Sequence, residues 1–352
     1  MSESSKINLK DCSPREVQEF IQGMQEPSYR ADQLLDWMYK KKILDASEMS
    51  NLPANLRSKL KEETRIVLLK LKEKLVSQKD GTEKYLFETL DRELLECAVM
   101  KQDYGNTVCV SSQIGCGLGC VFCASTRGGL VRNLSPGEML DQFILSEKHL
   151  EGEEGIRNIV VMGMGEPLNN LENLIRFLKT ANDKKGLGIS FRNMTVSTVG
   201  IAPGIIQLAE EGLPLTLAVS LHAPDNETRS SLIPANKKYP LEEVLDACHI
   251  YIEKTGRRVT FEYILLAGVN DSPEKASKLA RMIKKMLCHV NLIPVNPVGG
   301  ASLMKPGKKQ IYDFMEVLQN HHISVSLRRE QGGDIGGACG QLRRRFSGGG
   351  TA

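Results

Sequence analysis

Seven short apolar stretches alternate with segments of helical periodicity, and this alternation constrains the fold more than any other feature of the chain. The apolar stretches lie at 107–112, 157–163, 194–200, 215–221, 259–266, 289–295 and 323–329. Helical periodicity occurs between them, at 170–181, 203–212, 241–256, 272–286 and 308–322. Alternation of this kind predicts a parallel sheet that is covered by helices.

Polar or glycine-rich residues follow five of the apolar stretches, which favours a barrel over an open sheet. These segments read GMGEPLNN, STVGIAPG, SLHAPDN, LLAGVND and IPVNPVGG, in chain order. Groups contributed by many strand ends meet on the carboxyl rim of a barrel, whereas an open sheet concentrates its site at one switch point. We therefore expect an α/β fold built on a partial barrel, with the functional site on that rim.

The first hundred residues predict helices followed by a small antiparallel sheet. Ser13-Pro14-Arg15-Glu16 is a capping box with proline at the first helical position, and amphipathic segments follow at 31–42 and 55–64. Extended runs at 66–77, 84–90 and 94–100 are separated by turn signals. We expect a helical domain of the RNA-binding type at 1–64, a linking β extension at 65–104, the barrel at 105–346 and a flexible tail at 347–352.

Composition is typical of a cytoplasmic globular protein. The chain opens without the apolar core of a signal peptide, and no stretch approaches the about 18 apolar residues of a membrane span. In that compartment nine cysteines indicate reduced thiols, metal binding or catalysis. The net charge of +3 does not establish a polyanionic partner, although local basic groups are suited to phosphate contacts. Such groups include Arg30, Lys40 to Lys42, Arg57, Arg127 and Arg132.

Three thiols are concentrated in SSQIGCGLGCVFCAS, where Cys116, Cys120 and Cys123 have the spacing C-x3-C-x2-C. The intervening glycines let the backbone wrap closely around a bulky ligand. Three ligands are one short of a closed tetrahedral zinc site, unless Cys109 or a distant histidine completes it. An iron-sulfur cube held at three corners instead keeps one iron free to bind something else.

The ordered set of motifs resembles the radical S-adenosylmethionine (SAM) adenosine methyltransferase family. CGLGCVFC matches the superfamily motif, and TVCVSSQIGC, RNLSPGEML, GMGEPLNN, STVG, SLHAP, IPVNP and GGDIGGACGQL follow the family's order. The resemblance covers roughly residues 10 to 345. It implies a partial six-stranded (β/α) barrel after a small helical domain, with 323–329 as an extra strand. It also implies one 4Fe-4S cluster bound by Cys116, Cys120, Cys123 and SAM.

The resemblance implies a radical route to carbon 2 of adenine, an electron-poor carbon without a lone pair. Cys339 accepts a methyl group from one SAM, and a radical generated from a second SAM activates that S-methyl group for addition to the ring. Cys109 matches the thiol that then attacks the Cys339 sulfur, giving a transient disulfide that cellular thiols reduce. Glu96 matches the proton acceptor, although strand alternation alone would leave it solvated, and Cys109 itself is another candidate for the base.

Further matches imply contacts to SAM at the predicted strand ends. Gly165 and Glu166 match the element that binds the amino group of SAM, and Glu166 is suited to accept from an ammonium. The remaining matches are Ser197, Ser220, Leu221, His222 and Asn296. Cys12, Cys97, Cys248 and Cys288 match no motif, and we expect them to be apolar fillers.

The implied substrates are an adenosine of 23S rRNA in the peptidyl-transferase centre and the adenosine next to the anticodon of tRNAs. An external electron donor of the flavodoxin type and a thiol reductant are implied as partners, and nothing demands more than a monomer. Two alternatives stay open at this point. One is the sister activity that methylates carbon 8 and confers antibiotic resistance, and the other is a non-methylating iron-sulfur or zinc RNA-binding protein.

Overall fold

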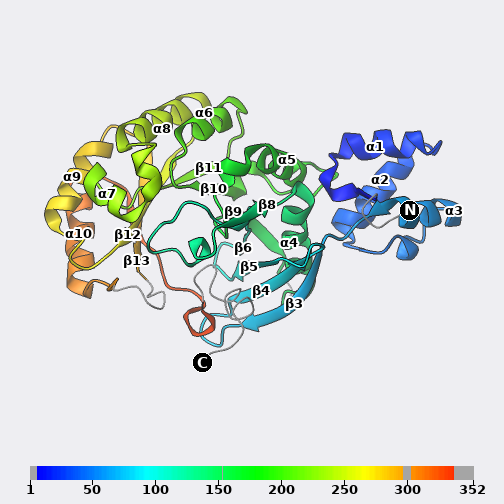
Figure 1. Cartoon of the computed structure of the whole chain (residues 1–352), viewed down its shortest axis with the longest axis horizontal. Coiled ribbons are helices and arrows are strands. Elements are labelled where there is room, and N and C mark those ends of the chain that lie inside the picture. The colour runs from blue at the N-terminus through cyan, green and yellow to red at the C-terminus, as the bar shows by residue number, and fades with distance from the viewer. Residues whose placement is uncertain (1–5, 153, 296–302, 337–352) are drawn as a thin grey trace.

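One curved sheet of ten strands organises the chain in a computed structural model that describes residues 6–152, 154–295 and 303–336. Seven of its strands are parallel neighbours, as the alternation predicts (Figure 1). They are β6 (Asn106–Cys109), β9 (Ile156–Val161), β10 (Met194–Thr198), β11 (Thr216–Ser220), β12 (Val259–Leu265), β13 (Cys288–Pro294) and β14 (Val325–Leu327). The expected α/β partial barrel is confirmed, and β14 is the extra strand beyond the sixth.

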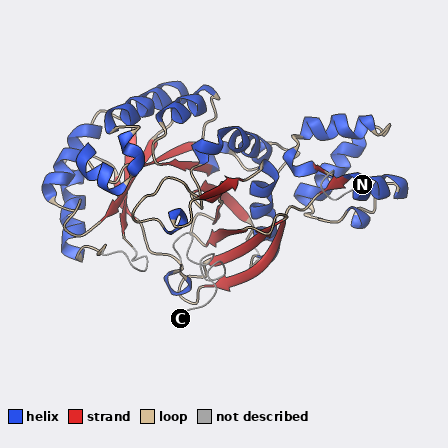
Figure 2. Ribbon diagram, viewed as in Figure 1, coloured by secondary structure: helices blue, strands red, loops and turns tan. Residues whose placement is uncertain are grey.

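Helices cover the convex side of this sheet (Figure 2). They are α4 (Pro136–His149), α5 (Leu171–Asn182), α6 (Ala202–Glu210), α7 (Asn226–Leu232), α8 (Leu241–Thr255), α9 (Pro273–Ile283) and α10 (Lys308–Asn320). The five segments of helical periodicity all form helices. The short α7 was not expected, because its polar sequence NETRSSL carries little periodicity; the side chain of Asp225 caps it by accepting from Thr228 N.

Three antiparallel strands extend the same sheet rather than form a separate one. They are β3 (Leu69–Val76), β4 (Glu83–Thr89) and β5 (Leu94–Met100). Strand β5 pairs antiparallel with β6 and sets Ala98 opposite Cys109, while the other edge of β6 pairs parallel with β9. The linking strands β3 to β5 therefore extend the barrel wall beyond its first parallel strand, β6.

The N-terminal module contains α1 (Pro14–Gly23), α2 (Tyr29–Leu35) and α3 (Ala54–Glu63), closed by the short parallel pair β1 (Ile7–Asn8) and β2 (Thr64–Arg65). The capping box forms as expected, because Ser13 Oγ accepts from Glu16 N and the Glu16 carboxylate accepts from Ser13 N. The expected helix at 31–42 forms as α2 up to Leu35 and continues as a π-helical turn at Asp36–Lys40.

A buried ion pair attaches this module to the barrel. Lys10 and Asp141 of α4 are in contact with both side chains fully buried. The second carboxylate oxygen of Asp141 accepts from Leu68 N at 2.6 Å and Leu69 N at 3.2 Å, at the start of β3. Asp141 thereby holds three segments together. No described helix is long and apolar enough to cross a membrane.

Candidate functional site

The three clustered thiols lie on a loop between β7 (Gln113–Gly115) and β8 (Leu130–Asn133), which pair with each other. Cys116 N donates to Gly129 O at 3.0 Å and closes the loop at its base. Cys116 and Cys120 are buried, and Cys123 is half-buried. Val121 N donates to Leu232 O, so the loop packs against the end of α7. The paired strands β7 and β8 and the end of α7 therefore fix the short loop that carries all three thiols.

Burial makes Cys116 and Cys120 poor anions in the absence of a metal. Burial, with a smaller contribution from neighbouring thiolates, raises the pKa of Cys116 to about 11 and that of Cys120 to about 12. A metal centre that binds them must displace their protons. Among the described residues, no three His, Cys, Asp or Glu side chains surround one metal position. A cube in which each thiolate binds a different iron fits this spacing better than a tetrahedral zinc ion does.

The segment after β9 lies against the strand that enters the thiol loop. A Cβ on Gly163 would lie 2.8 Å from Ser111 N, and one on Gly165 would lie 2.9 Å from Gln113 N. Gly165 also has φ +105°, a conformation that side chains rarely adopt. Glycine is therefore required at both positions for GMGEP to approach the backbone this closely.

The Glu166 carboxylate joins two strand-end loops. One oxygen accepts from Leu168 N at 3.1 Å and the other from Val199 N, after β10, at 2.9 Å. Burial raises the pKa of Glu166 to about 7, against the lowering effect of these donors. The sequence predicts a carboxylate turned toward an ammonium. In the structure this side chain is 2% exposed, and its oxygens already bind backbone.

His222 follows β11 and faces the thiol loop. It is buried with φ +59°, and its Nδ1 accepts from Ile264 N at 3.1 Å, so the imidazole proton is on Nε2. Burial lowers the pKa of His222 to about 3 and keeps the ring neutral. This ring and that of Phe122 lie in a T-shaped arrangement, with the ring centroids 4.8 Å apart. Ser220 ends β11 two residues before His222, with Leu221 between them, and Ser197 is the penultimate residue of β10.

Arg229 of α7 is a residue that sequence reasoning missed. Its guanidinium is buried and donates to carbonyls at the ends of two strands: Val199 O after β10, and Ser220 O and Leu221 O at β11. Desolvation lowers its pKa to about 10, which leaves it charged at neutral pH. Nothing in NETRSSL distinguishes this arginine from a solvated one, because its partners are backbone atoms distant in sequence.

Glu96, expected to be solvated on alternation alone, is instead buried. It forms an ion pair with Lys84 at 2.9 Å, and the two side chains are 4% and 3% exposed. Both line a pocket with Cys109, Gly163 and Met164. Alternation fails here because both faces of β5 are covered: Cys97 on the opposite face contacts Ser146 of α4. The structure therefore brings Glu96, Cys109 and the GMGEP segment together.

Two predicted site residues, Asn296 and Cys339, lie outside the described residues. Of the four cysteines expected to be apolar fillers, Cys97 and Cys248 are buried, and Cys12 and Cys288 are half-buried.

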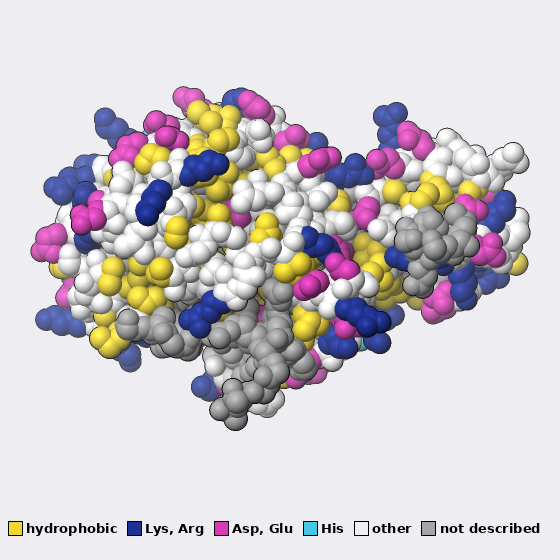
Figure 3. Space-filling model, viewed as in Figure 1, with side chains coloured by type: hydrophobic (Ala, Val, Ile, Leu, Met, Phe, Trp, Pro, Cys, Tyr) yellow, Lys and Arg dark blue, Asp and Glu magenta, His cyan; other side chains and the backbone are white. Residues whose placement is uncertain are grey.

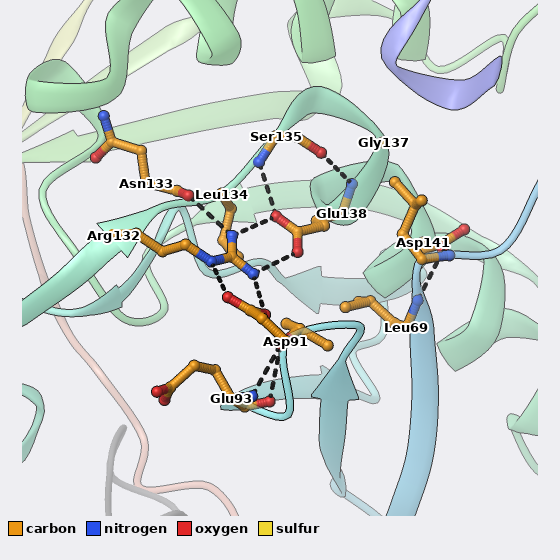
Figure 4. Close-up of polar contacts among 12 residues, drawn as sticks. Leu69, Asp91, Glu93, Arg132, Asn133, Leu134, Ser135, Gly137, Glu138 and Asp141 are labelled. Atoms are coloured by element: carbon orange, nitrogen blue, oxygen red, sulfur yellow. Dashed lines mark hydrogen bonds and ion pairs between the residues drawn. The ribbon is translucent and has the colours of Figure 1, made fainter. Parts of the chain in front are cut away.

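Arg132, proposed from the sequence as a phosphate contact, instead binds two carboxylates of the protein itself (Figure 4). It makes paired hydrogen bonds of 2.7 Å to Asp91 and of 2.8 Å to Glu138. Asp91 lies in the β4–β5 turn and Glu138 in the first turn of α4, so Arg132 fastens β8 to both. Basic and acidic side chains are interspersed on the face shown in Figure 3.

The fold and the thiol loop define the class of protein. Residues 110–280 match the family model described as the radical SAM superfamily. A crystal structure described as a radical SAM methyltransferase from Sphaerobacter thermophilus superposes with a TM-score of 0.92 and 41% identity, over 95% of this chain and 98% of that one. The chain is a radical SAM enzyme, a class whose chemistry implies a 4Fe-4S cluster and SAM.

Two further similarities concern the whole chain. Residues 7–66 match the model described as the ribosomal RNA large subunit methyltransferase N-terminal domain. Proteins named probable dual-specificity RNA methyltransferase RlmN are similar over nearly full length. The one from Natranaerobius thermophilus is 50% identical over 97% of this chain and 98% of its own length, and the one from Symbiobacterium thermophilum is 47% identical over 98% and 93%. The chain belongs to the RlmN family.

Gly165→Ala is expected to lower the free energy of unfolding by about 3 kcal/mol, because the new Cβ is strained at this φ and collides with Gln113. Gly212→Ala is the control. Gly212 also has positive φ, +62°, but a Cβ there meets nothing within 4 Å, so its cost is about 1 kcal/mol. Chemical denaturation of the metal-free proteins measures both values. Equal losses would contradict the close approach of GMGEP to the 111–113 backbone.

Arg229→Met is expected to lower the free energy of unfolding by at least about 3 kcal/mol, because several buried carbonyls lose their donor. Arg281→Met on the exposed face of α9 is the matched control, expected within about 0.5 kcal/mol of wild type. The same denaturation measurement applies. A loss at position 229 no larger than the control's would show that Arg229 does not fasten the strand ends.

Proposed function

We propose that this enzyme methylates carbon 2 of an adenosine in 23S rRNA, in the peptidyl-transferase centre, and of the adenosine next to the anticodon in tRNAs. Names of relatives that are 47% and 50% identical over nearly the whole chain support RNA as the substrate. The N-terminal match to a ribosomal RNA methyltransferase domain supports the 23S assignment. Ribosomal and transfer RNA as substrates support a cytoplasmic location.

Cys116, Cys120 and Cys123 bind the cluster in this proposal. Their burial on one loop and their spacing support that role, since the cluster replaces the protons that desolvation otherwise retains. A cluster held by these thiols, together with SAM, would supply the radical chemistry that carbon 2 of adenine requires. Gly165, Glu166, Ser197, Ser220 to His222 and Asn296 are the proposed SAM contacts. The neutral ring of His222, beside Phe122, is suited to a hydrogen bond and a stacked contact with SAM.

Cys339 carries the methyl group to the RNA in this proposal, and Glu96 and Cys109 complete the turnover. Glu96 accepts the proton that leaves carbon 2. The Cys109 thiolate attacks the Cys339 sulfur and forms a Cys109–Cys339 disulfide. The carbon–sulfur bond breaks, its electron pair stays on the methylene carbon attached to the base, and that carbon takes up a proton to become the methyl group. Two electrons from a thiol reductant restore both thiols, and an external flavodoxin-type donor supplies the electron for radical formation.

The observation that carries this proposal is the shared pocket of Glu96 and Cys109. Cys109 is half-buried, as a thiol that must meet a partner needs to be. Glu96 is buried beside it and held by Lys84. A buried carboxylate and a half-buried thiol in one pocket next to the GMGEP segment support this reaction over an RNA-binding role without it.

The test uses protein with an anaerobically reconstituted cluster, supplied with SAM, a reductant and RNA from cells that lack the modification. Mass spectrometry of digested nucleosides is expected to show 2-methyladenosine in both ribosomal and transfer RNA. A product with 8-methyladenosine would assign the sister activity instead. SAM cleavage without either product would overturn the methyltransferase proposal.

A further inference from the structure

The turn between β3 and β4 binds a segment from the other end of the chain. Ser77 Oγ donates to Asp334 Oδ1 at 2.7 Å, and Gln78 N donates to Asp334 Oδ2 at 3.0 Å. In return, Gly332 N donates to Asp80 Oδ2 at 2.8 Å. Each segment both donates to the other and accepts from it, although the paired residues are more than 250 positions apart in the sequence. We call this contact between 77–84 and 332–336 the hairpin dock.

Lys84 connects the hairpin dock to the Glu96 pocket. Its ammonium donates to Gly336 O at 2.7 Å and pairs with the Glu96 carboxylate at 2.9 Å. The side chain is 3% exposed, so both contacts are made away from bulk water, where they are strong. An ammonium carries three donors and can satisfy both acceptors at once. The pocket that Lys84 lines also contains Cys109.

The docked segment has a defined backbone shape up to Gly336. Gly332 and Gly336 both adopt left-handed conformations, with φ of +61° and +69°, on either side of the short helical turn Gly333–Ile335. Gly336 is three residues before Cys339 in the sequence. Chain connectivity alone keeps the Cys339 Cα within about 11 Å of the Gly336 Cα. Whatever fixes Gly336 therefore limits where the Cys339 thiol can go.

We propose that Lys84 is a positioning residue of the methylation reaction: through the hairpin dock it holds the segment that leads to Cys339 against the pocket of Glu96 and Cys109. This inference rests on the proposed function, because it takes the roles of those three residues from there. It assigns the β3–β4 hairpin the task of bringing the methyl-carrying thiol, the proton acceptor and the resolving thiol to one place.

Loss of the hairpin dock is expected to uncouple methyl transfer from SAM cleavage rather than to lower both activities equally. A Cys339 segment that is released from Lys84 spends less time beside the radical source and beside Cys109, whereas SAM cleavage needs neither contact. Misplacement by about 1 Å is enough to cost about a hundredfold in rate. The ratio of 2-methyladenosine to 5′-deoxyadenosine is therefore the informative quantity, since a general folding defect lowers both products together.

The experiment compares Lys84→Met with Lys72→Met in the reconstituted enzyme. Lys72 is a neighbouring lysine on β3 whose exposed ion pair with Glu88 has no part in the dock. Lys84→Met is expected to lower the ratio of 2-methyladenosine to 5′-deoxyadenosine at least tenfold and to lower the fraction of S-methylated Cys339 in purified protein. Lys72→Met is expected to match wild type in both. Lys84→Arg, which keeps a charged donor, is expected to restore part of the ratio.

Asp334→Ala keeps the test decisive if Lys84→Met does not fold. Asp334 is an exposed residue that contacts the turn at Ser77 and Gln78 but not the Glu96 pocket, and its loss is expected to lower the same ratio about threefold or more. Wild-type enzyme that forms no 2-methyladenosine would overturn the proposed function itself. Active wild-type enzyme with unchanged ratios in Lys84→Met, or in Asp334→Ala where Lys84→Met does not fold, would overturn the role of the dock alone.

Discussion

The architecture depends on strand β6, which is hydrogen-bonded on one edge to an antiparallel strand and on the other to a parallel one. Because β6 belongs to both systems, the hairpins before it and the barrel after it form one continuous wall. Cys109 ends this strand, and Ser111, just beyond it, donates to Glu96 O and accepts from Met164 N. The shared strand therefore fixes the distance between Glu96 on β5, Cys109 on β6 and the GMGEP loop after β9.

Local pattern was enough to predict the barrel because its strands and helices follow simple periodicities. All seven apolar stretches form parallel strands, and every segment of helical periodicity between them forms a helix. Strand ends rich in glycine and polar residues indicated the rim, and the closeness of Gly163 and Gly165 to the 111–113 backbone explains why glycine recurs there. Periodicity could not show that β3 to β5 join the same sheet. The pattern of one strand does not say which other strand will pair with its edge.

Buried charge was the part of the site that sequence could not predict. Glu96, Arg229 and Arg132 all look like surface residues in their own segments. Their surroundings come from elsewhere: Lys84, which also donates to Gly336 O, pairs with Glu96, strand-end carbonyls accept from Arg229, and two carboxylates bind Arg132. Glu96 and Arg229 are buried where water is lost on folding and an unpaired group is costly, whereas the Arg132 side chain stays 31% exposed. Motif resemblance singled out Glu96 but not Lys84.

The partnership of Cys109 and Cys339 is the central claim, and a single variant tests it most directly. Cys109→Ala enzyme with a reconstituted cluster would be incubated with SAM, reductant and substrate RNA, then separated under denaturing conditions and digested for mass spectrometry. The account predicts a covalent protein–RNA species, with the methylated adenosine attached through Cys339, because no thiol remains to release it. Release of free 2-methyladenosine-containing RNA at the wild-type rate would contradict the resolving role of Cys109.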